Sequence, residues 1–324
     1  MRKNVLFLLI SLFWICQTEA ANFKAIMVTD VAGLGDRSFN DAAWEGMAKA
    51  KKDLGIEIGV LQSAEQADYI SNLNLAAQDG QAILAMGFYL ADAVTKVGPL
   101  YPRHNFIFID GCIQAPNVAS YLYKSEEGAY LAGILAASVT STGVVGVVEG
   151  DEIPPVKVFE AGFRAGVMAA NSALGKKVKV LVASAGDFNN PSKGKSLAQS
   201  LAGQKADIIF QIAGNTGLGV FEWLKSTPGK VYAIGSDMNQ DGIVPGRVLT
   251  SVVKRTSVAA YQAVKSAKEG KFRPGCNKIG LAEGAIDITE LKYTKQLVPP
   301  QAVKLVDDAR KMIITGKLRV PDKD

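Results

Sequence analysis

The chain of 324 residues exceeds the size of an average single domain, and its 48% hydrophobic and 21% charged residues are ordinary for a globular protein. The net charge is +5, but the lysines are scattered, so the sequence lacks the basic stripe with interleaved aromatics of a nucleic-acid-binding surface. The single histidine, His104, removes any Ser-His-Asp, Cys-His or multi-histidine zinc site that does not use it. We therefore expect no metal, no cofactor and no nucleic-acid partner.

Residues 1–21 have the three parts of a secretory signal peptide. Two basic residues precede an apolar run over 5–15, which is too short to span a bilayer, and small residues follow near Ala20. Cys16 leaves a second reading open, because bacterial lipoproteins are cleaved just before a lipid-modified cysteine. Bulky residues precede this cysteine, so we favour cleavage near Ala20. We expect an exported protein in the periplasm or at the cell surface, with a lipid anchor at Cys16 as the alternative.

From residue 23 onward, short apolar runs alternate with amphipathic helical patterns. This spacing predicts parallel sheets with helices on both faces, that is, an α/β fold. The expected strands are 23–29, 58–61, 82–87, 105–110, 117–122, 144–149, 178–184, 207–213, 230–235 and 248–253. The expected helices are 40–54, 67–79, 90–100, 126–141, 156–174, 193–204, 217–226, 256–269 and 300–316.

The series of strands divides near residues 121–126, which predicts two Rossmann-like lobes. No low-complexity linker interrupts the chain, so we expect the chain to cross directly between the lobes. At the first helix, Ser38 followed by Asp41 resembles a capping box.

The loop over residues 29–40 links the first strand to the first helix and is rich in glycine and aspartate. Open α/β sheets bind ligands at the carboxyl ends of their strands, so this loop is a candidate binding site. Asp30, Asp110 and Asp237 each end a strand in an equivalent place. Such carboxylates can accept hydrogen bonds from a ligand, act as acid and base in a glycosidase, or simply cap helices and turns.

Phe39 lies beside Asn40 on this loop, where it is either a hydrophobic staple or a stacking surface for a planar ligand. Phe210, close to the end of a strand, is either a core residue or faces Phe39 across a cleft, and Phe188 is the competing partner. The glycine run that begins at Gly214 is a weak match to a phosphate loop. A tight turn that lets the backbone approach a neutral ligand fits it better.

Eight segments, in order along the chain, resemble the basic membrane protein family of bacterial substrate-binding proteins, whose characterised members include purine nucleoside receptors. They lie at 28–46, 108–110, 127–133, 159–163, 190–194, 209–217, 234–237 and 249–255. The sequence departs from the family's pattern at Met238-Asn239-Gln240, which follows Asp237 where the family often has Asp-Gln at once.

The resemblance implies a type I periplasmic-binding-protein fold, with two lobes joined by three crossovers that close on a ligand. The first lobe is expected to comprise residues 22–123 and 247–280, and the second 124–246 and 281–324. Whether Cys112 and Cys276 form a disulfide or stay free is left open by their spacing.

In the nucleoside-binding members the base lies between two phenylalanines, which the resemblance assigns to Phe39 and Phe210. Matching residues imply that Asp237 and Lys254 hold the ribose and that Asp30, Asn40 and Asp110 contact ribose or base edges, with Gly214 in the same site. The resemblance thus implies a monomeric receptor that catalyses no reaction and delivers a purine nucleoside to an ABC permease in the inner membrane. A sugar ligand and an exported carboxylate-dependent hydrolase are the alternatives.

Overall fold

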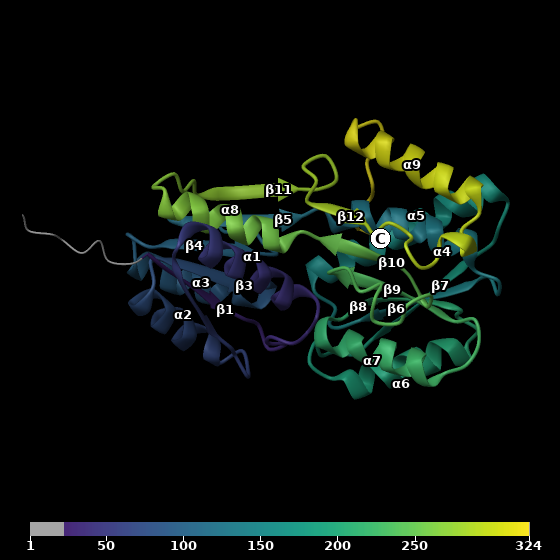
Figure 1. Cartoon of the computed structure of the whole chain (residues 1–324), viewed down its shortest axis with the longest axis horizontal. Coiled ribbons are helices and arrows are strands. Elements are labelled where there is room, and N and C mark those ends of the chain that lie inside the picture. The colour runs from purple at the N-terminus through teal and green to yellow at the C-terminus, as the bar shows by residue number, and fades with distance from the viewer. Residues whose placement is uncertain (1–22, 324) are drawn as a thin grey trace, which may run out of the picture.

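The structure, a computed structural model, describes residues 23–323 and forms two α/β lobes, each built on a six-stranded sheet (Figure 1). The expected signal peptide and Cys16 lie outside the described residues. Within them, no helix is long and apolar enough to cross a membrane.

The first lobe has the strand order β11-β5-β4-β3-β1-β2, all parallel. Helices α1 and α8 cover one face, and α2 and α3 cover the other (Figure 1). Its elements are β1 (Lys24–Val28), α1 (Phe39–Leu54), β2 (Glu57–Leu61), α2 (Asp68–Asp79), β3 (Ala82–Met86), η1 (Phe88–Leu90), α3 (Ala91–Val97), η2 (Gly98–Leu100), β4 (Asn105–Ile109), β5 (Val118–Tyr123), α8 (Thr256–Lys268) and β11 (Gly275–Ile279).

The second lobe has the strand order β12-β10-β9-β8-β6-β7, with only β12 antiparallel. Helices α4, α5 and α9 cover one face, and α6 and α7 cover the other (Figure 1). Its elements are α4 (Ser125–Val139), β6 (Val144–Glu149), α5 (Pro154–Leu174), β7 (Lys179–Ser184), α6 (Pro191–Gly203), β8 (Ile208–Ile212), α7 (Gly214–Ser226), β9 (Tyr232–Asp237), β10 (Val248–Lys254), β12 (Ile286–Ile288), η3 (Lys295–Leu297) and α9 (Pro300–Ile314).

The central strands of the first lobe, β3 and β4, are nearly continuous apolar runs because helices bury both faces of the sheet. In the second lobe β8 and β9 also carry buried polar residues, Gln211 and Ser236. Helix α4 is buried almost all round, and it packs closely on α5 through glycines. A Cβ on Gly166 would lie 2.1 Å from the carbonyl oxygen of Tyr130, and one on Gly133 would lie 2.3 Å from that of Phe163. Gly133 belongs to a segment that carries the family resemblance, so part of that resemblance reflects helix packing.

The chain crosses between the lobes three times, after β5, after β10 and after β11, as expected. The second crossing lies later than the expected boundary at residue 247. β10 pairs with β9 in the second sheet, so the chain enters the first lobe only after Lys254. The expected strands omitted β11 and β12, because β11 carries polar residues at a sheet edge and β12 has only 3 residues.

Cys112 and Cys276 form a disulfide within the first lobe, with their Cα atoms 5.3 Å apart. The bond joins the turn after β4 to the edge strand β11. Of the two possibilities that the spacing of the cysteines left open, a disulfide and two free thiols, the structure has the disulfide.

Candidate functional site

A cavity lies between the lobes, at the carboxyl ends of strands from both sheets. It holds about 600 Å³ of empty space, including the part that opens to solvent. The first lobe contributes Asp30, Ala32, Asp36, Phe39, Asn40, Gly87, Phe88, Tyr89 and Asp110; the second contributes Ile153, Pro155, Val156, Phe159, Phe188, Ile212, Gly214, Ser236 and Asp237; and Lys254 comes from the second crossing. Of the predicted site residues, the structure leaves only Phe210 outside this cavity.

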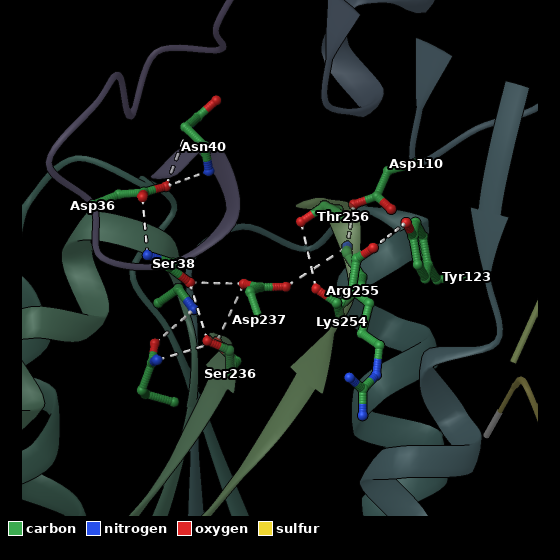
Figure 2. A network of polar contacts seen from close by, with 12 residues as sticks. Asp36, Ser38, Asn40, Asp110, Tyr123, Ser236, Asp237, Lys254, Arg255 and Thr256 are labelled. Atoms are coloured by element: carbon green, nitrogen blue, oxygen red, sulfur yellow. Dashed lines mark hydrogen bonds and ion pairs between the residues drawn. The ribbon is translucent and has the colours of Figure 1, made fainter. Parts of the chain in front are cut away.

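Asp36 organises the loop that leads into α1. Its buried carboxylate accepts hydrogen bonds from the backbone N–H groups of Ser38 (2.9 Å), Asn40 (2.8 Å) and Asp41 (3.1 Å), so it occupies the place of a helix cap (Figure 2). Burial raises the pKa of Asp36 to about 7, and these bonds oppose the rise.

The expected capping box between Ser38 and Asp41 is wrong. The Ser38 hydroxyl instead donates to the Asp237 carboxylate of the other lobe, at 2.7 Å. Sequence reasoning missed Asp36, although an aspartate just before a helix was the available signal.

Asn40 and Asp30 form a polar pair on the cavity wall. The Asn40 side-chain Nδ2 donates to Asp30 Oδ1 at 2.8 Å and to Asp36 Oδ2 at 3.2 Å. This orients Asn40 so that its Oδ1 is buried and has no hydrogen-bond partner among residues 23–323. A buried acceptor without a partner costs about 1–3 kcal/mol, so this oxygen is suited to an N–H or O–H donor on a ligand.

Burial also raises the pKa of Asp30 to about 6, and the hydrogen bond from Asn40 opposes the rise. The nearby charges of Asp110 and Asp237 raise it further. Asp30 therefore changes its charge close to neutral pH, on a wall that a ligand would touch.

Among residues 23–323, Lys254 provides the one ammonium group that lines the cavity. Its Nζ lies 2.6 Å from Asp110 Oδ2 and 3.7 Å from Asp237 Oδ1 (Figure 2). The same Nζ lies 4.6 Å from the ring centroid of Phe39, within range of a cation–π contact. Burial raises the pKa of Asp110, and the Lys254 charge partly offsets the rise.

Asp110 and Asp237 both adopt the left-handed backbone conformation, with φ of 72° and 65°. This conformation is costly for residues other than glycine and persists where the surrounding structure holds it, often at binding sites. Their shared contact with Lys254 is one such constraint. The cluster therefore presents two carboxylates and one ammonium group to the cavity in fixed positions.

Phe210 does not face Phe39, and that prediction is wrong. Its side chain is fully buried, and its ring lies 5.2 Å from that of Phe163 and 6.1 Å from that of Phe159, centroid to centroid. Phe210 and Ile212 lie on the same face of β8, but only Ile212 at the strand end reaches the cavity, about 7 Å beyond Phe210, which α5 covers.

The second-lobe rings that line the cavity are Phe159 and Phe188, and Phe188 was the competing candidate. Phe159, which lies on α5, was missed because its spacing is that of an ordinary core position. Gly214 lines the cavity as expected, with φ of 54° at the start of α7.

Contacts between the lobes close over the cavity. The Tyr89 hydroxyl of the first lobe donates to the Asp151 carboxylate of the second, and Ser38 donates to Asp237. The structure is thus a closed form in which both lobes contribute to one site. Tyr89 also escaped the sequence analysis, although it lies just after Gly87 at the end of β3.

Two α/β lobes joined by three crossings, with polar and aromatic residues of both lobes around one cavity, define a ligand-binding protein of the type I periplasmic-binding-like class. The chain belongs to the family of PnrA-like ABC transporter substrate-binding proteins, whose model matches residues 23–324. Members of this family are substrate-binding proteins of ABC transporters and not enzymes, and membership implies a small-molecule ligand and a permease partner.

Individual relatives agree with this assignment. The chain is 36% identical to a CD4+ T-cell-stimulating antigen of Listeria monocytogenes, covering 94% of this chain and 90% of the relative. It is 33% identical to the ABC transporter nucleoside-binding protein BmpA of Lactococcus lactis, covering 93% and 90%. A crystal structure of an ABC transporter solute-binding protein from Aeropyrum pernix matches with a TM-score of 0.87 at 29% identity, covering 92% of this chain and 94% of that one.

Proposed function

We propose that this protein is an exported substrate-binding protein of an ABC importer and that it captures a purine nucleoside in the cavity between its lobes. The single observation that carries the proposal is the wall formed by Phe39, Asn40 and Asp30, where a ring lies beside an unpartnered buried acceptor. A purine base offers a flat face to the ring and N–H donors at its edge. The Lactococcus relative named as a nucleoside-binding protein supports the same ligand class.

We assign roles within the site from the positions of its residues. Phe39 and Phe188 supply the aromatic surfaces from the two lobes, and Asn40 Oδ1 with the Asp30 carboxylate accepts hydrogen bonds from the base edge. Asp110, Asp237 and Lys254 form the polar cluster that suits ribose hydroxyls, since charged groups make the stronger hydrogen bonds. A sugar ligand is the second candidate, favoured by the same carboxylates.

Isothermal titration calorimetry with inosine, guanosine, adenosine, free purine bases and ribose tests the proposal. We expect sub-micromolar binding of at least one nucleoside and weaker binding of ribose. The absence of such binding to every nucleoside would contradict the nucleoside assignment, and tight binding of ribose alone would favour the sugar. The recovery of unaltered nucleoside after incubation would separate a receptor from a hydrolase.

Two phenylalanine variants distinguish stacking from core packing. Phe188→Ala should weaken nucleoside binding about tenfold or more, because base stacking on an aromatic ring contributes roughly 1–3 kcal/mol. Phe210→Ala is the matched control. It should lower the free energy of unfolding by about 3–5 kcal/mol and leave the affinity of the folded protein within about threefold of wild type. The opposite pattern would restore Phe210 as the stacking ring.

A further inference from the structure

Gln240 lies in the loop between β9 and β10, in the segment where the sequence departs from its family's pattern. Its side chain is 1% exposed and is held tightly by the second lobe. Its Oε1 accepts hydrogen bonds from Gln211 Nε2 at 2.7 Å and from the backbone N–H of Ser236 at 2.9 Å. Its own backbone N–H donates to Ser251 Oγ at 3.0 Å. Strands β8 and β9 therefore fix this side chain, and β10 fixes its backbone.

The strand beneath Gln240 is shaped to receive it. A Cβ on Gly235 would lie 2.6 Å from Gln240 Oε1 and 2.6 Å from Ser251 Oγ, so β9 needs a glycine where the glutamine packs over it.

The one remaining bond of the Gln240 amide crosses to the first lobe. Its Nε2 donates to the carbonyl oxygen of Arg37 at 2.9 Å. Arg37 has a φ of 47°, a conformation that a residue other than glycine keeps only when its surroundings hold it. The next residue, Ser38, donates to Asp237 at 2.7 Å and to the carbonyl oxygen of Ser236 at 3.3 Å. The first lobe thus docks residues 37–38 onto the turn over 236–240.

This docking adjoins the binding site on both sides. Phe39 follows the docked segment directly, and Asp237 lies within the turn that receives it, and both line the cavity. Gln240 itself is not among the residues that line the cavity. Separation of the lobes would break the hydrogen bond from Gln240 Nε2 to the Arg37 carbonyl oxygen and would leave this amide N–H without its acceptor.

We propose that Gln240 is a positioning residue that holds the two lobes closed over the ligand by binding the Arg37 carbonyl. The contact between Gln240 and Arg37 lies outside the ligand site and would stabilise the closed form. The proposal rests on the proposed function only for the choice of the ligand that serves as a probe. Lobe closure of this kind shifts the balance between open and shut forms, and ligand release requires the open form.

The test measures the distance between the lobes with spin labels on Gln66→Cys and Lys193→Cys, two exposed positions near the outer strands β2 and β7. Gln240→Met removes the donor and keeps the length of the side chain. We expect the ratio of short to long distances to fall about tenfold or more, with or without saturating inosine, because a lost buried hydrogen bond has this order of effect. Inosine dissociation, measured by stopped flow, should accelerate by a similar factor, with little change in the association rate.

Gln240→Glu is the second variant, and its response to pH separates closure from general stability. A protonated glutamic acid keeps both an acceptor and an O–H donor for Arg37, whereas a carboxylate has no donor. We expect near-normal closure at low pH and opening as the pH rises, beyond any change that wild type shows at the same pH values. A role in folding alone would lower the melting temperature without this pH-dependent change in distance.

Ser251→Ala is the matched control, because it removes a buried hydrogen bond to Gln240 and spares the bond to Arg37. It should leave the distances and the dissociation rate at wild-type values. Wild-type distances in both Gln240 variants would overturn the proposal, as would a wild-type protein with no short-distance population in any condition. Failure of wild type to bind any of the nucleosides would contradict the proposed function and not the role of Gln240, which the distances without ligand still decide.

Discussion

At the scale of single residues, the site is defined by buried carboxylates that share few compensating charges. Asp30, Asp36, Asp110 and Asp237 line the cavity with one ammonium group, that of Lys254. Their roles differ because their surroundings differ. Asp36 accepts hydrogen bonds from backbone N–H groups, and Asp110 forms an ion pair with Lys254. Asp30 can still accept a further hydrogen bond from a ligand. A cavity with this excess of negative charge favours neutral ligands over phosphorylated ones.

The raised pKa of Asp30 predicts that nucleoside affinity depends on pH. Its pKa is about 6 in the folded protein, so the carboxylate gains a proton as the pH falls through about 6 and loses an acceptor for a ligand N–H. We expect the affinity for inosine to be constant above about pH 7 and to fall by up to roughly tenfold per pH unit below 6. Calorimetry at pH 5, 6, 7 and 8 measures this.

Asp30→Asn is the control for that profile, since an amide has no charge to lose. The variant should bind the nucleoside more weakly at every pH, and its affinity should not fall as the pH decreases through 6. Any change of affinity that remains near pH 7 is assigned to Asp36. A flat wild-type profile would show that the Asp30 carboxylate does not accept from the ligand.

The raised pKa of Asp30 affects the stability of the protein in the opposite direction. Between about pH 4 and 6 the folded chain keeps a proton on Asp30 that the unfolded chain has lost, because the pKa of this group is 3.8 when unfolded. The contribution of Asp30 to the free energy of unfolding therefore falls as the pH rises from about 4 to 6.

At the scale of single elements, β11 is an edge strand that local signals do not explain. It carries polar residues, and it is held by its parallel pairing with β5 and by the disulfide between Cys276 and Cys112. Cys112 lies two residues beyond Asp110, so the bond ties the turn that carries a site residue to the sheet edge. The two cysteines are 164 residues apart, and the whole β6–β10 region of the second lobe lies between them.

Loss of this disulfide should lower the stability of the protein strongly. A cross-link that closes so long a loop restricts the unfolded chain, and its removal costs roughly 3–5 kcal/mol. Urea unfolding of the oxidised protein and of the Cys112→Ser, Cys276→Ser double variant should show this difference in the free energy of unfolding. A reducing agent should destabilise wild type and leave the double variant unchanged. Equal stability of the oxidised protein and the variant would contradict the expectation.

At the scale of the whole molecule, the two lobes meet through a few polar contacts around the cavity. At one place Tyr89 of the first lobe donates a hydrogen bond to Asp151 of the second. At another, residues 37–38 of the first lobe contact the turn over 236–240 of the second. The chain crosses beside β5, β10 and β11, on the side of each sheet away from β2 and β7. Opening about these crossings would separate the contacts without unfolding either core.

Tyr89→Phe should therefore speed the release of ligand. The substitution keeps the ring in the cavity wall and removes only the hydroxyl that binds Asp151 across the cleft. We expect nucleoside dissociation to accelerate about three- to tenfold, since one hydrogen bond contributes about 0.5–1.5 kcal/mol. Stopped-flow measurement with Tyr101→Phe, a first-lobe tyrosine away from the cavity, provides the control. Equal dissociation rates in wild type and Tyr89→Phe would show that this contact does not limit opening.

The alternation of strands and helices could be predicted from the sequence, because apolar runs and helical periods are local properties of the chain. It also placed Asp30, Asp110 and Asp237 in one site, since residues that directly follow parallel strands meet at one edge of a sheet. The resemblance of the motifs added Asn40 and Lys254, and both line the cavity.

Other features of the fold and the site depend on contacts between residues that are far apart in the sequence. Phe210 stands two residues before the strand end, on the same face as Ile212, but the packing of Phe159 and Phe163 of α5 over its ring is a tertiary contact. The lobe boundary after Lys254, the pairing of β11 and the disulfide join residues far apart in the chain, so no local pattern carries them. The Ser38 hydroxyl does not cap its own helix, because Asp36 already accepts the backbone N–H groups of Asn40 and Asp41. It donates to Asp237 of the other lobe, which only the folded chain brings within reach.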